Sequence, residues 1–398
     1  MRVLFVHQNF PGQFRHVALA LGKRPGTGIA AITDEVNKQQ LTGLATARYR
    51  FQPAPLPGLS SAAAALTTRF RRAEAVAAAM LEVKKRGFVP DVIVGHPGWG
   101  ELMLAREIFP ASRMIAHAEY YYSAKGADVG FDPEFPEAMD EISIRLKAKN
   151  IPLLAAITDS TCSVAPTAWQ ASRFPPELRS KIVHIHEGIR TDLVKPDPAA
   201  VYEHNLGGLS FRPGDEVITF VNRNLEPMRG FHIFMRALPR ILAARPKAHV
   251  VIVGGDGVSY GAPPPKGQTW KAIFLAEVAD RLPMERVHFV GQVPYANFIA
   301  LMQISRLHIY ATYPFVLSWS MLEAMSAGAL VLGSATPPVT EMIEHGRNGL
   351  LYDFFDIEAL AASAIDALAH PERHAGLRAN ARRFIAERYD LASVCLPA

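Results

Sequence analysis

Short apolar segments alternate along the chain with longer segments of helical periodicity, and this alternation restricts the possible folds more than any other feature. Strands that alternate with helices pair in parallel and are covered by helices on both faces. The pattern therefore predicts an α/β protein. The predicted strands are Val3–His7, Ile29–Thr33, Asp91–Gly95, Arg113–Ala118 and Ile182–His186, followed by Val217–Asn222, Ala248–Val253, Val287–Val290, Leu307–Tyr310 and Ala329–Gly333.

The two groups of strands predict two Rossmann-like domains, because 398 residues exceed the size of one typical domain. The run Lys195–Pro198, with the sequence Lys-Pro-Asp-Pro, is typical of a linker. We therefore predict an N-terminal domain over residues 1–195 and a second domain over 196–375. The Ala- and Arg-rich segment Glu372–Tyr389 predicts a terminal helix, and we assign residues 376–398 to it.

Several classes of protein are disfavoured by the residues after the first strand and by the two cysteines. The strand leads into Gln-Asn-Phe-Pro-Gly-Gln-Phe and not into G-x-G-x-x-G, so a usual nicotinamide dinucleotide site is not expected. Cys162 and Cys395 match no metal or redox spacing. The longest uncharged stretch, Ala324–Thr340, carries Gly, Ser and two prolines and does not resemble a membrane span. We expect a cytoplasmic protein.

The segment Phe315–Ser334 combines a loop, a helix with Glu323 in its first turns, and a buried strand. A helix N-terminus offers free N–H groups and the positive end of the helix dipole, which suits a diphosphate. A carboxylate there can accept hydrogen bonds from a ribose diol. Equally, Glu323 can be a glutamate that only stabilises the helix dipole.

The segment Phe220–Phe231 places Arg223 and Arg229 in the connection after a strand. Ligands of open α/β sheets bind at the carboxyl ends of the strands. Two guanidinium groups at that edge can clamp a diphosphate and neutralise the charge of a leaving group. Either arginine alone is more commonly a solvated surface residue.

Taken in order, these segments resemble family 4 glycosyltransferases of the GT-B fold, over nearly the whole chain. The matching motifs are the strand, Pro-Gly and helix of Val3–Leu21, the loop His186–Ile189, the basic pair in Asn222–Gly230, the "G-x-V" of Val290–Val293 and the "E-A-M-A-x-G-x-P-V-V" segment at Glu323–Val331. The resemblance implies two Rossmann-like domains that face a central cleft, with a C-terminal helix that returns to the N-terminal domain.

The resemblance also implies roles for individual residues. Glu323 matches the glutamate that binds the donor ribose. Arg223 and Arg229 match the arginine and lysine pair that binds its phosphates, with Arg229 in place of the lysine. Gly12 matches the glycine whose loop approaches the phosphates, and His117 matches a histidine near the donor sugar. Further donor-binding positions are Val290, Gly291, Leu317, Ser318 and Trp319. His96 and Glu119 are expected on the acceptor side.

One departure from the family motif concerns its first glutamate, which falls at Phe315. In the family that carboxylate and the following amides hold sugar hydroxyls and phosphates. The amides of Leu317, Ser318 and Trp319 can still do so, but the carboxylate contact is lost. The substitution bears on the identity of the donor sugar and on activity itself.

The expected reaction is transfer of a sugar from a UDP- or GDP-sugar to a hydroxyl of a glycan, a lipid-linked acceptor or a small molecule, as in polysaccharide biosynthesis. A nucleoside diphosphate is a good leaving group, so arginines and helix-end amides can stabilise it, and no metal or other cofactor is expected. The resemblance implies retention, and we favour front-face attack because no carboxylate nucleophile stands out. The alternatives are a nucleotide-sugar epimerase and a non-catalytic nucleotide-sugar-binding protein.

Positive charge is concentrated at the start of the chain, where residues 1–86 hold 13 Lys and Arg against 4 Asp and Glu. A helix is predicted over Ala62–Gly87, with an apolar face formed by Leu66, Phe70, Ala73, Ala77 and Met80. Its cations suit an anionic membrane or an acidic acceptor, or simply a solvated face. Nucleic acid is not expected, because no aromatic residues are interleaved. The cations are Arg69, Arg71, Arg72, Lys84, Lys85 and Arg86.

Overall fold

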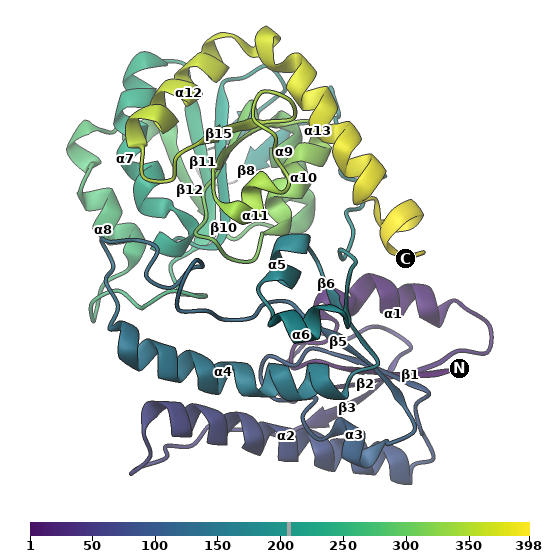
Figure 1. Ribbon diagram of the computed structural model, residues 1–398. Coiled ribbons are helices and arrows are strands. Elements are labelled where there is room, and N and C mark those ends of the chain that lie inside the picture. Colours follow the sequence, from purple (N-terminus) through teal and green to yellow (C-terminus); the bar gives the residue numbers. More distant parts are fainter. Residues whose placement is uncertain (205–207) are drawn as a thin grey trace. The chain divides into compact units, whose positions relative to one another are not determined.

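A computed structural model describes residues 1–204 and 208–398 of the chain. The chain forms two compact units, one of Met1–Glu187 with Cys395–Ala398 and one of Gly188–Val394 (Figure 1). Each unit contains one large parallel sheet with helices packed on it. The α/β class predicted from the alternation of segments is therefore confirmed.

The first unit is built on a parallel sheet of seven strands. Five of them were predicted, and two further strands, β3 and β6, lie in segments without a marked apolar run. The strands are β1 (Arg2–Val6), β2 (Gly28–Asp34), β3 (Ala45–Tyr49), β4 (Val92–Gly95), β5 (Arg113–His117), β6 (Cys162–Ala165) and β7 (Ile182–His184). Their order in the sheet is β3-β2-β1-β4-β5-β6-β7.

Side chains of β1 alternate between the two apolar layers of this unit. Leu4 and Val6 pack with residues of α2 on one face, whereas Val3 and Phe5 pack with Phe14 and helix α1 on the other. A strand buried on both faces explains the nearly continuous apolar run of β1. The helices are α1 (Arg15–Gly22), α2 (Ser61–Lys85), α3 (Ala105–Ile108), α4 (Met139–Asp159), α5 (Ala168–Ser172) and α6 (Pro176–Arg179), with a 3₁₀ turn at Gly12–Phe14.

Helix α2 occupies the predicted segment, but its buried face differs from the prediction. Phe70 is 44% exposed, whereas Ala73, Val76, Met80 and Val83 are buried. The buried residues follow spacings of three and four from Ala73 onward, so the buried face shares Ala73 and Met80 with the predicted one but does not include Phe70. The N-terminal half of α2 thus buries less apolar surface than expected.

The second unit is built on a parallel sheet of six strands in the order β12-β11-β10-β13-β14-β15, together with an antiparallel pair β8-β9. All five predicted strands are present, and β15 completes the sheet. The strands are β8 (Tyr202–His204), β9 (Leu209–Phe211), β10 (Val217–Asn224), β11 (His249–Gly255), β12 (Val287–Gly291), β13 (Leu307–Tyr310), β14 (Leu330–Ser334) and β15 (Leu350–Tyr352).

Both faces of this sheet are covered by helices. Phe220 of β10 stacks on Phe234 of helix α7, with ring centres 4.3 Å apart, while Val221 packs with Leu322 and Met325 of α10 on the opposite face. The helices are α7 (Phe231–Ala244), α8 (Trp270–Ala276), α9 (Tyr295–Ile304), α10 (Trp319–Ala327), α11 (Pro337–Thr340), α12 (Ile357–Ala369) and α13 (Ala375–Arg388). Short helical turns occupy Pro227–Arg229, Ala279–Arg281, Met284–Arg286, Pro371–His374 and Leu391–Cys395.

The terminal helix α13 belongs to the second unit, whereas the sequence predicted a helix that returns to the N-terminal domain. Ala381 and Ile385 are buried in the core that contains residues of α10. Arg382 donates hydrogen bonds to the carbonyl oxygens of Thr191 and Val194. Of the C-terminal segment, only Cys395–Ala398 are grouped with the first unit.

The division between the units also differs from the predicted linker. It falls between Glu187 and Gly188, whereas Lys195–Pro198 lies inside the second unit. Val194 is fully buried in that unit's core, and a Cβ atom on Gly328 would lie 2.9 Å from Cγ of Pro196. The proline-rich run is therefore packed against the second unit and does not act as a free connection.

Candidate functional site

The order of the first sheet reverses direction between β1 and β4, and ligands of open α/β sheets bind in the crevice at such a point. His7 directly follows β1 and His96 directly follows β4. Both side chains are buried, and their rings meet edge to face with centres 5.5 Å apart. The topology therefore brings polar residues from distant parts of the sequence to one edge of the sheet.

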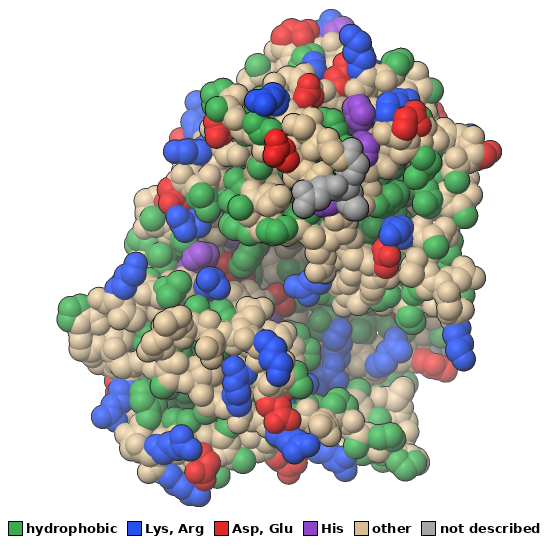
Figure 2. Space-filling model, turned by 180° about the vertical axis from the view of Figure 1, so that it is seen from behind, with side chains coloured by type: hydrophobic (Ala, Val, Ile, Leu, Met, Phe, Trp, Pro, Cys, Tyr) green, Lys and Arg blue, Asp and Glu red, His purple; other side chains and the backbone are tan. Residues whose placement is uncertain are grey.

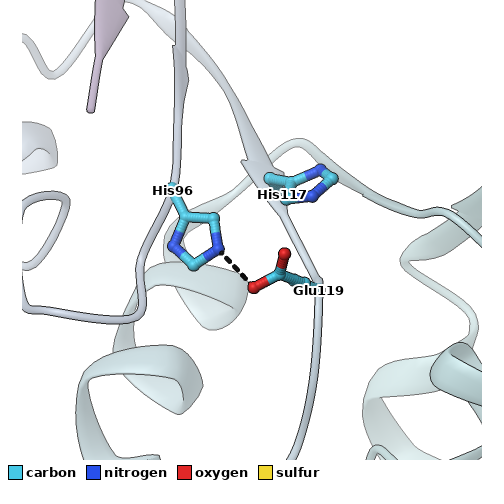
Figure 3. Close-up of side chains that lie close together, drawn as sticks. All are labelled: His96, His117 and Glu119. Carbon is cyan, nitrogen blue, oxygen red and sulfur yellow. Dashed lines mark hydrogen bonds and ion pairs between the residues drawn. The ribbon is translucent and has the colours of Figure 1, made fainter. Parts of the chain in front are cut away.

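His96 and Glu119, both predicted on the acceptor side, form a hydrogen bond (Figure 3). The Nε2 atom of His96 lies 3.1 Å from Oε2 of Glu119, and its Nδ1 atom accepts a hydrogen bond from the Gly98 amide. Because Nδ1 accepts, the proton of the neutral ring is on Nε2, which donates to the carboxylate. The side-chain amide of Gln13 donates to the other oxygen, Oε1, at 3.0 Å.

These contacts hold Glu119 in its ionised form. Burial alone would raise the pKa of its carboxyl group, but the hydrogen bond from His96, the nearby histidine charges and the bond from Gln13 lower it to about 2. The Glu119 side chain is still 28% exposed, so part of it faces solvent. The residue is a fixed, accessible hydrogen-bond acceptor.

His117 is the last residue of β5 and lies next to a glutamate that the sequence interpretation missed. Its Nε2 atom is 3.3 Å from Oε1 of Glu187, and both side chains are almost fully buried. Burial would lower the pKa of His117, but Glu187 and the charge of Glu119 raise it above its usual value. Glu187 follows the short strand β7, so only the strand order reveals that it approaches His117.

His96, His117 and Glu119 also form a group whose donor atoms lie within 4.8 Å of one another, a spacing that a metal ion could use (Figure 3). The hydrogen bonds do not favour that use. His96 Nδ1 accepts from an amide, so Nε2 carries the proton and has no lone pair for an ion unless the Gly98 contact breaks. The residues fit a hydrogen-bonded network better than they fit a metal centre.

Gly12 lies in the turn that follows β1, as predicted, and its backbone explains why glycine is needed. Its φ of +44° is in the left-handed region, and an added Cβ atom would lie 2.9 Å from Cε1 of His7. Any side chain would therefore strain the backbone and collide with a buried ring. The Gly12 backbone therefore lies directly against the His7 ring at the carboxyl end of β1.

In the second unit the sheet reverses direction between β10 and β13. Arg223 is exposed near the end of β10, whereas Arg229, in the turn that follows, is only 5% exposed. The two arginines predicted as a pair therefore have different surroundings, and Arg229 is the more constrained of the two.

The guanidinium group of Arg229 is held entirely by neutral groups. Its Nη1 atom donates to the hydroxyl of Thr312 at 2.9 Å and to the carbonyl of Val316 at 3.0 Å. Its central carbon lies 5.1 Å from the ring centre of Tyr260 and 5.5 Å from that of Phe315. Among the side chains that the structure describes, no carboxylate forms an ion pair with it. Arg229 is thus a buried cation without an anion.

Phe315, at the position of the family's glutamate, is buried and belongs to the same cluster. Its ring centre lies 5.0 Å from that of Tyr260, and both rings contact Arg229. A carboxylate at this position would have been a natural partner for the Arg229 charge. The phenyl ring contacts the guanidinium group without neutralising it.

Tyr260 is placed by Glu226, and neither residue was singled out from the sequence. The buried Glu226 carboxylate accepts hydrogen bonds from the amides of Ser259, Tyr260 and Gly261, at 3.2 to 3.3 Å. These bonds fix the loop that carries the Tyr260 ring. A lone glutamate beside Pro227 carries no sequence signal for such a role.

The helix N-terminus predicted to bind phosphates is partly occupied by the protein itself. The Ser318 amide donates to the hydroxyl of Tyr310 at 2.8 Å, and the Ser318 side chain accepts from the Ser320 amide. The expectation that the Ser318 amide is available is therefore wrong in this structure. Leu317 and Trp319 carry the two other amides that were predicted.

Glu323 lies in the middle of α10 and does not cap the helix, because Ser318 is the N-cap. Its Oε1 atom accepts a hydrogen bond of 2.6 Å from the Tyr295 hydroxyl. Burial raises the pKa of the Glu323 carboxyl group, and the Tyr295 bond opposes that shift. Val290 and Gly291 end β12, shortly before Tyr295 begins α9, and Gly291 has a φ of +66°. The capping interpretation of Glu323 is thereby corrected.

The basic surface of α2 is smaller than its number of cations predicts, because some of these side chains contact other parts of the protein. Arg72 forms an ion pair of 3.0 Å with Asp34 and contacts the Tyr49 hydroxyl, while Lys84 donates to the Ile108 carbonyl. Arg69 is only partly exposed. Arg71, Lys84, Lys85 and Arg86 are exposed, and Lys85 forms an ion pair of 2.8 Å with Glu82.

No basic face dominates the view of Figure 2, where Lys and Arg side chains are interspersed with acidic and apolar ones. Every helix among residues 1–204 and 208–398 is too short or too polar to span a bilayer.

Two family models match the chain in succession. The model described as "Glycosyl transferase family 4 group" matches residues 25–194, and the model described as "Glycosyl transferases group 1" matches residues 206–384. Between them they cover most of both units.

Among characterised relatives, a D-inositol 3-phosphate glycosyltransferase of Thermobispora bispora is 26% identical over 218 residues, which are 53% of this chain and 47% of that protein. A GDP-mannose-dependent alpha-(1-6)-phosphatidylinositol monomannoside mannosyltransferase of Mycobacterium tuberculosis is 26% identical over 325 residues, or 78% and 76% of the two chains. The match to the first of these relatives spans only about half of its length.

Among solved structures, HepE of Anabaena in complex with UDP superimposes with a TM-score of 0.67. The two chains are 18% identical, and the match covers 99% of this chain and 97% of the other. At this level of identity the likeness concerns the fold.

Proposed function

The chain belongs to family 4 of the glycosyltransferases, with the GT-B fold, and we propose that it transfers a sugar from a nucleoside diphosphate sugar to a hydroxyl group of an acceptor. The acceptor classes that we consider are glycans, lipid-linked acceptors and small molecules. We expect this reaction to be part of polysaccharide biosynthesis.

One observation carries this proposal, namely the buried charge of Arg229. A charged side chain is rarely buried without a partner, because removal from water costs several kcal/mol. Arg229 has only neutral partners among the described residues. The diphosphate of a nucleotide sugar would supply the missing anion. Arg223, exposed near the end of β10, is suited to bind it as well.

Glu323 supports the nucleotide part of the proposal. A buried carboxylate with only one oxygen engaged by Tyr295 can accept a further hydrogen bond. We propose that it binds the ribose diol, and that Gly291, Val290, Leu317 and Trp319 line the nucleotide. UDP is bound by HepE, and GDP-mannose is the donor of the mycobacterial relative. We therefore propose UDP or GDP as the donor nucleotide.

The proposed reaction retains the anomeric configuration. The bond between the anomeric carbon and the phosphate oxygen breaks, its electron pair stays on the diphosphate, and the acceptor oxygen bonds to the same face of the sugar. The acceptor proton passes to the departing phosphate. The arginines stabilise the charge that develops there. This step needs no metal ion and no covalent intermediate on a side chain.

His117 and Glu119 are proposed as groups that bind sugar hydroxyls on the donor and acceptor sides, with His96 orienting Glu119 and Gly12 allowing close approach of the loop after β1. Their network at the carboxyl ends of β1, β4 and β5 supports this role. Arg71, Lys85 and Arg86 are proposed as the residues of α2 that would contact an anionic acceptor or an anionic membrane from the cytoplasmic side.

A thermal-shift screen with UDP-, GDP- and ADP-sugars, followed by NMR of the product's anomeric proton, tests the proposal. A shift with a uridine or guanosine donor and a product of retained configuration are expected. Inversion, or capture of a covalent glycosyl-enzyme, would contradict the mechanism. Conversion of one nucleotide sugar into another without acceptor would indicate an epimerase, and binding without any turnover would indicate a binding protein.

A further inference from the structure

Trp99 lies beside the His96–Glu119 pair and has no part in the proposed reaction. Its indole ring is half-buried and lies on the His96 ring, with centres 4.6 Å apart and an interplanar angle of 32°. The His7 ring meets it edge to face at 5.9 Å. The Trp99 side chain is therefore held by two buried histidines, although part of it still faces solvent.

The backbone beside Trp99 is fixed as well. The Trp99 amide donates to Oε2 of the buried Glu101 at 3.2 Å, and the preceding amide of Gly98 donates to His96 Nδ1 at 3.1 Å. A Cβ atom on Gly98 would lie 2.8 Å from the His96 ring. This loop has little freedom, so the indole is positioned before any ligand arrives.

Glu119 also contacts His96, the residue on which the Trp99 ring lies. Each of its carboxylate oxygens accepts one hydrogen bond, from His96 and from Gln13, and keeps further acceptor capacity. An ionised carboxylate with two partly open oxygens can accept from two adjacent hydroxyl groups. It would repel a phosphate, so a neutral polyol is the ligand that fits.

We infer that Trp99 and Glu119 form a subsite for a neutral pyranose of the acceptor, with two adjacent hydroxyls on Glu119 and an apolar sugar face on the Trp99 ring. That this sugar belongs to the acceptor rests on the proposed function, but binding of the sugar itself requires no donor. His96 and Gln13 are positioning residues that orient the carboxylate. Of the three acceptor classes, this favours one that presents an uncharged sugar.

Trp99 supplies the measurement, because its emission responds to a ring stacked on it. The full chain is titrated, without nucleotide, with the methyl glycosides of glucose, galactose, mannose and N-acetylglucosamine. We expect a saturable change in tryptophan emission with at least one of them. The change should vanish in Trp99→Phe and persist in the control Trp270→Phe, which alters a half-buried tryptophan of the second unit.

Glu119→Gln keeps the size of the side chain and removes its charge. Loss of charge-assisted hydrogen bonds should weaken glycoside binding by about tenfold. Glu107→Gln, which alters an exposed glutamate of α3, is the matched control and should not change it. Absence of any saturable change, or an undiminished change in Glu119→Gln, would overturn the inference.

A parallel titration of the wild-type chain with UDP and GDP separates the sugar subsite from the donor site. If a nucleotide binds and none of the glycosides does, the sugar subsite is wrong and the proposed function stands. If a glycoside binds through Trp99 and neither nucleotide does, the subsite stands and the donor assignment fails.

Discussion

The guanidinium carbon of Arg229 lies 5.5 Å from the centre of the Phe315 ring, in a cluster that Tyr260 completes. The family motif has a lysine and a glutamate at these two positions, and this chain has an arginine and a phenylalanine. A flat guanidinium group can lie against aromatic rings, which an ammonium group does less well. The two differences thus form one consistent arrangement, in which the cation is positioned but not neutralised.

Restoring the family's glutamate at position 315 is expected to impair this protein. In Phe315→Glu the new carboxylate would pair with Arg229 in a buried site and cancel the charge that a diphosphate needs. We expect affinity for UDP or GDP to fall by about tenfold or more, equivalent to about 1.4 kcal/mol. Isothermal titration calorimetry measures this directly.

Phe315→Leu is the matched control, because it removes the ring but adds no charge. Loss of one cation–π contact of about 0.5–1 kcal/mol predicts a loss of only about two- to fivefold. Nucleotide binding in Phe315→Glu that equals or exceeds the wild type would refute the arrangement.

Glu323 is expected to contribute to nucleotide affinity through its carboxylate. Hydrogen bonds to a charged group are worth about 1.5–3 kcal/mol, so Glu323→Ala should weaken UDP or GDP binding by about tenfold or more. Tyr295→Phe removes the internal partner of Glu323 Oε1 and should have a smaller effect, because the carboxylate stays. Calorimetry that finds equal affinity for wild type and Glu323→Ala would return that residue to a structural role.

Because the Glu101 carboxyl group is buried, we expect the free energy of unfolding of the protein to depend on pH. Burial raises the pKa of its carboxyl group from 4.5 to about 7, and no described group bonds its Oε1 atom. Between pH 4.5 and about pH 7, the Glu101 carboxyl group is ionised in the unfolded chain but still carries its proton in the folded chain. The free energy of unfolding therefore keeps its full value below pH 4.5. As the pH rises from 4.5 to about 7, the free energy of unfolding falls by about 3 kcal/mol.

The variant Glu101→Gln removes that titration and should keep the bond from the Trp99 amide. Its thermal unfolding midpoint should exceed that of the wild type at about pH 8 and approach it at about pH 5. Glu107→Gln, on the surface of α3, should show no such dependence. An offset between Glu101→Gln and wild type that is the same at both pH values would show that Glu101 does not titrate in this way.

Contact with an anionic surface is expected to depend on the exposed cations of α2. At low salt the chain should sediment with anionic vesicles, and the triple substitution Arg71→Ala, Lys85→Ala and Arg86→Ala should reduce this. Replacement of the exposed pair Lys23 and Arg24 by alanine is the control. High salt should release the protein, because the screening length falls to about 3 Å at 1 M. A chain that stays in the supernatant at low salt has no such surface.

The fold was largely predictable because most strands are buried on both faces and carry continuous apolar runs. β3, with the sequence Ala-Thr-Ala-Arg-Tyr, was missed because an edge strand alternates small and polar residues. The predicted face of α2 was displaced because periodicity alone does not show which turns meet the sheet. The assignment of α13 required tertiary contacts, since Ala381 and Ile385 give no indication of their partner.

Candidate site residues that lie in a recognisable motif could be predicted from the sequence. Those whose roles depend on contacts with residues distant in the sequence could not. Arg229, Glu323 and His117 lie in recognisable segments at strand ends. Glu187 and Tyr260 do not, because their roles arise from strand order and from a loop fixed by a buried carboxylate. The hydrogen bond that engages the Ser318 amide likewise depends on a hydroxyl group from β13, that of Tyr310.

The most direct test of the proposed function is release of nucleoside diphosphate from UDP- and GDP-sugars, by the wild-type chain and by Arg229→Met. Arg240→Met, which alters an exposed arginine of α7, is the control. We predict release by the wild type and the control, and a loss of about a hundredfold or more in Arg229→Met, because removal of a buried charged contact costs about 3 kcal/mol or more. Equal release by Arg229→Met and wild type would contradict the central claim.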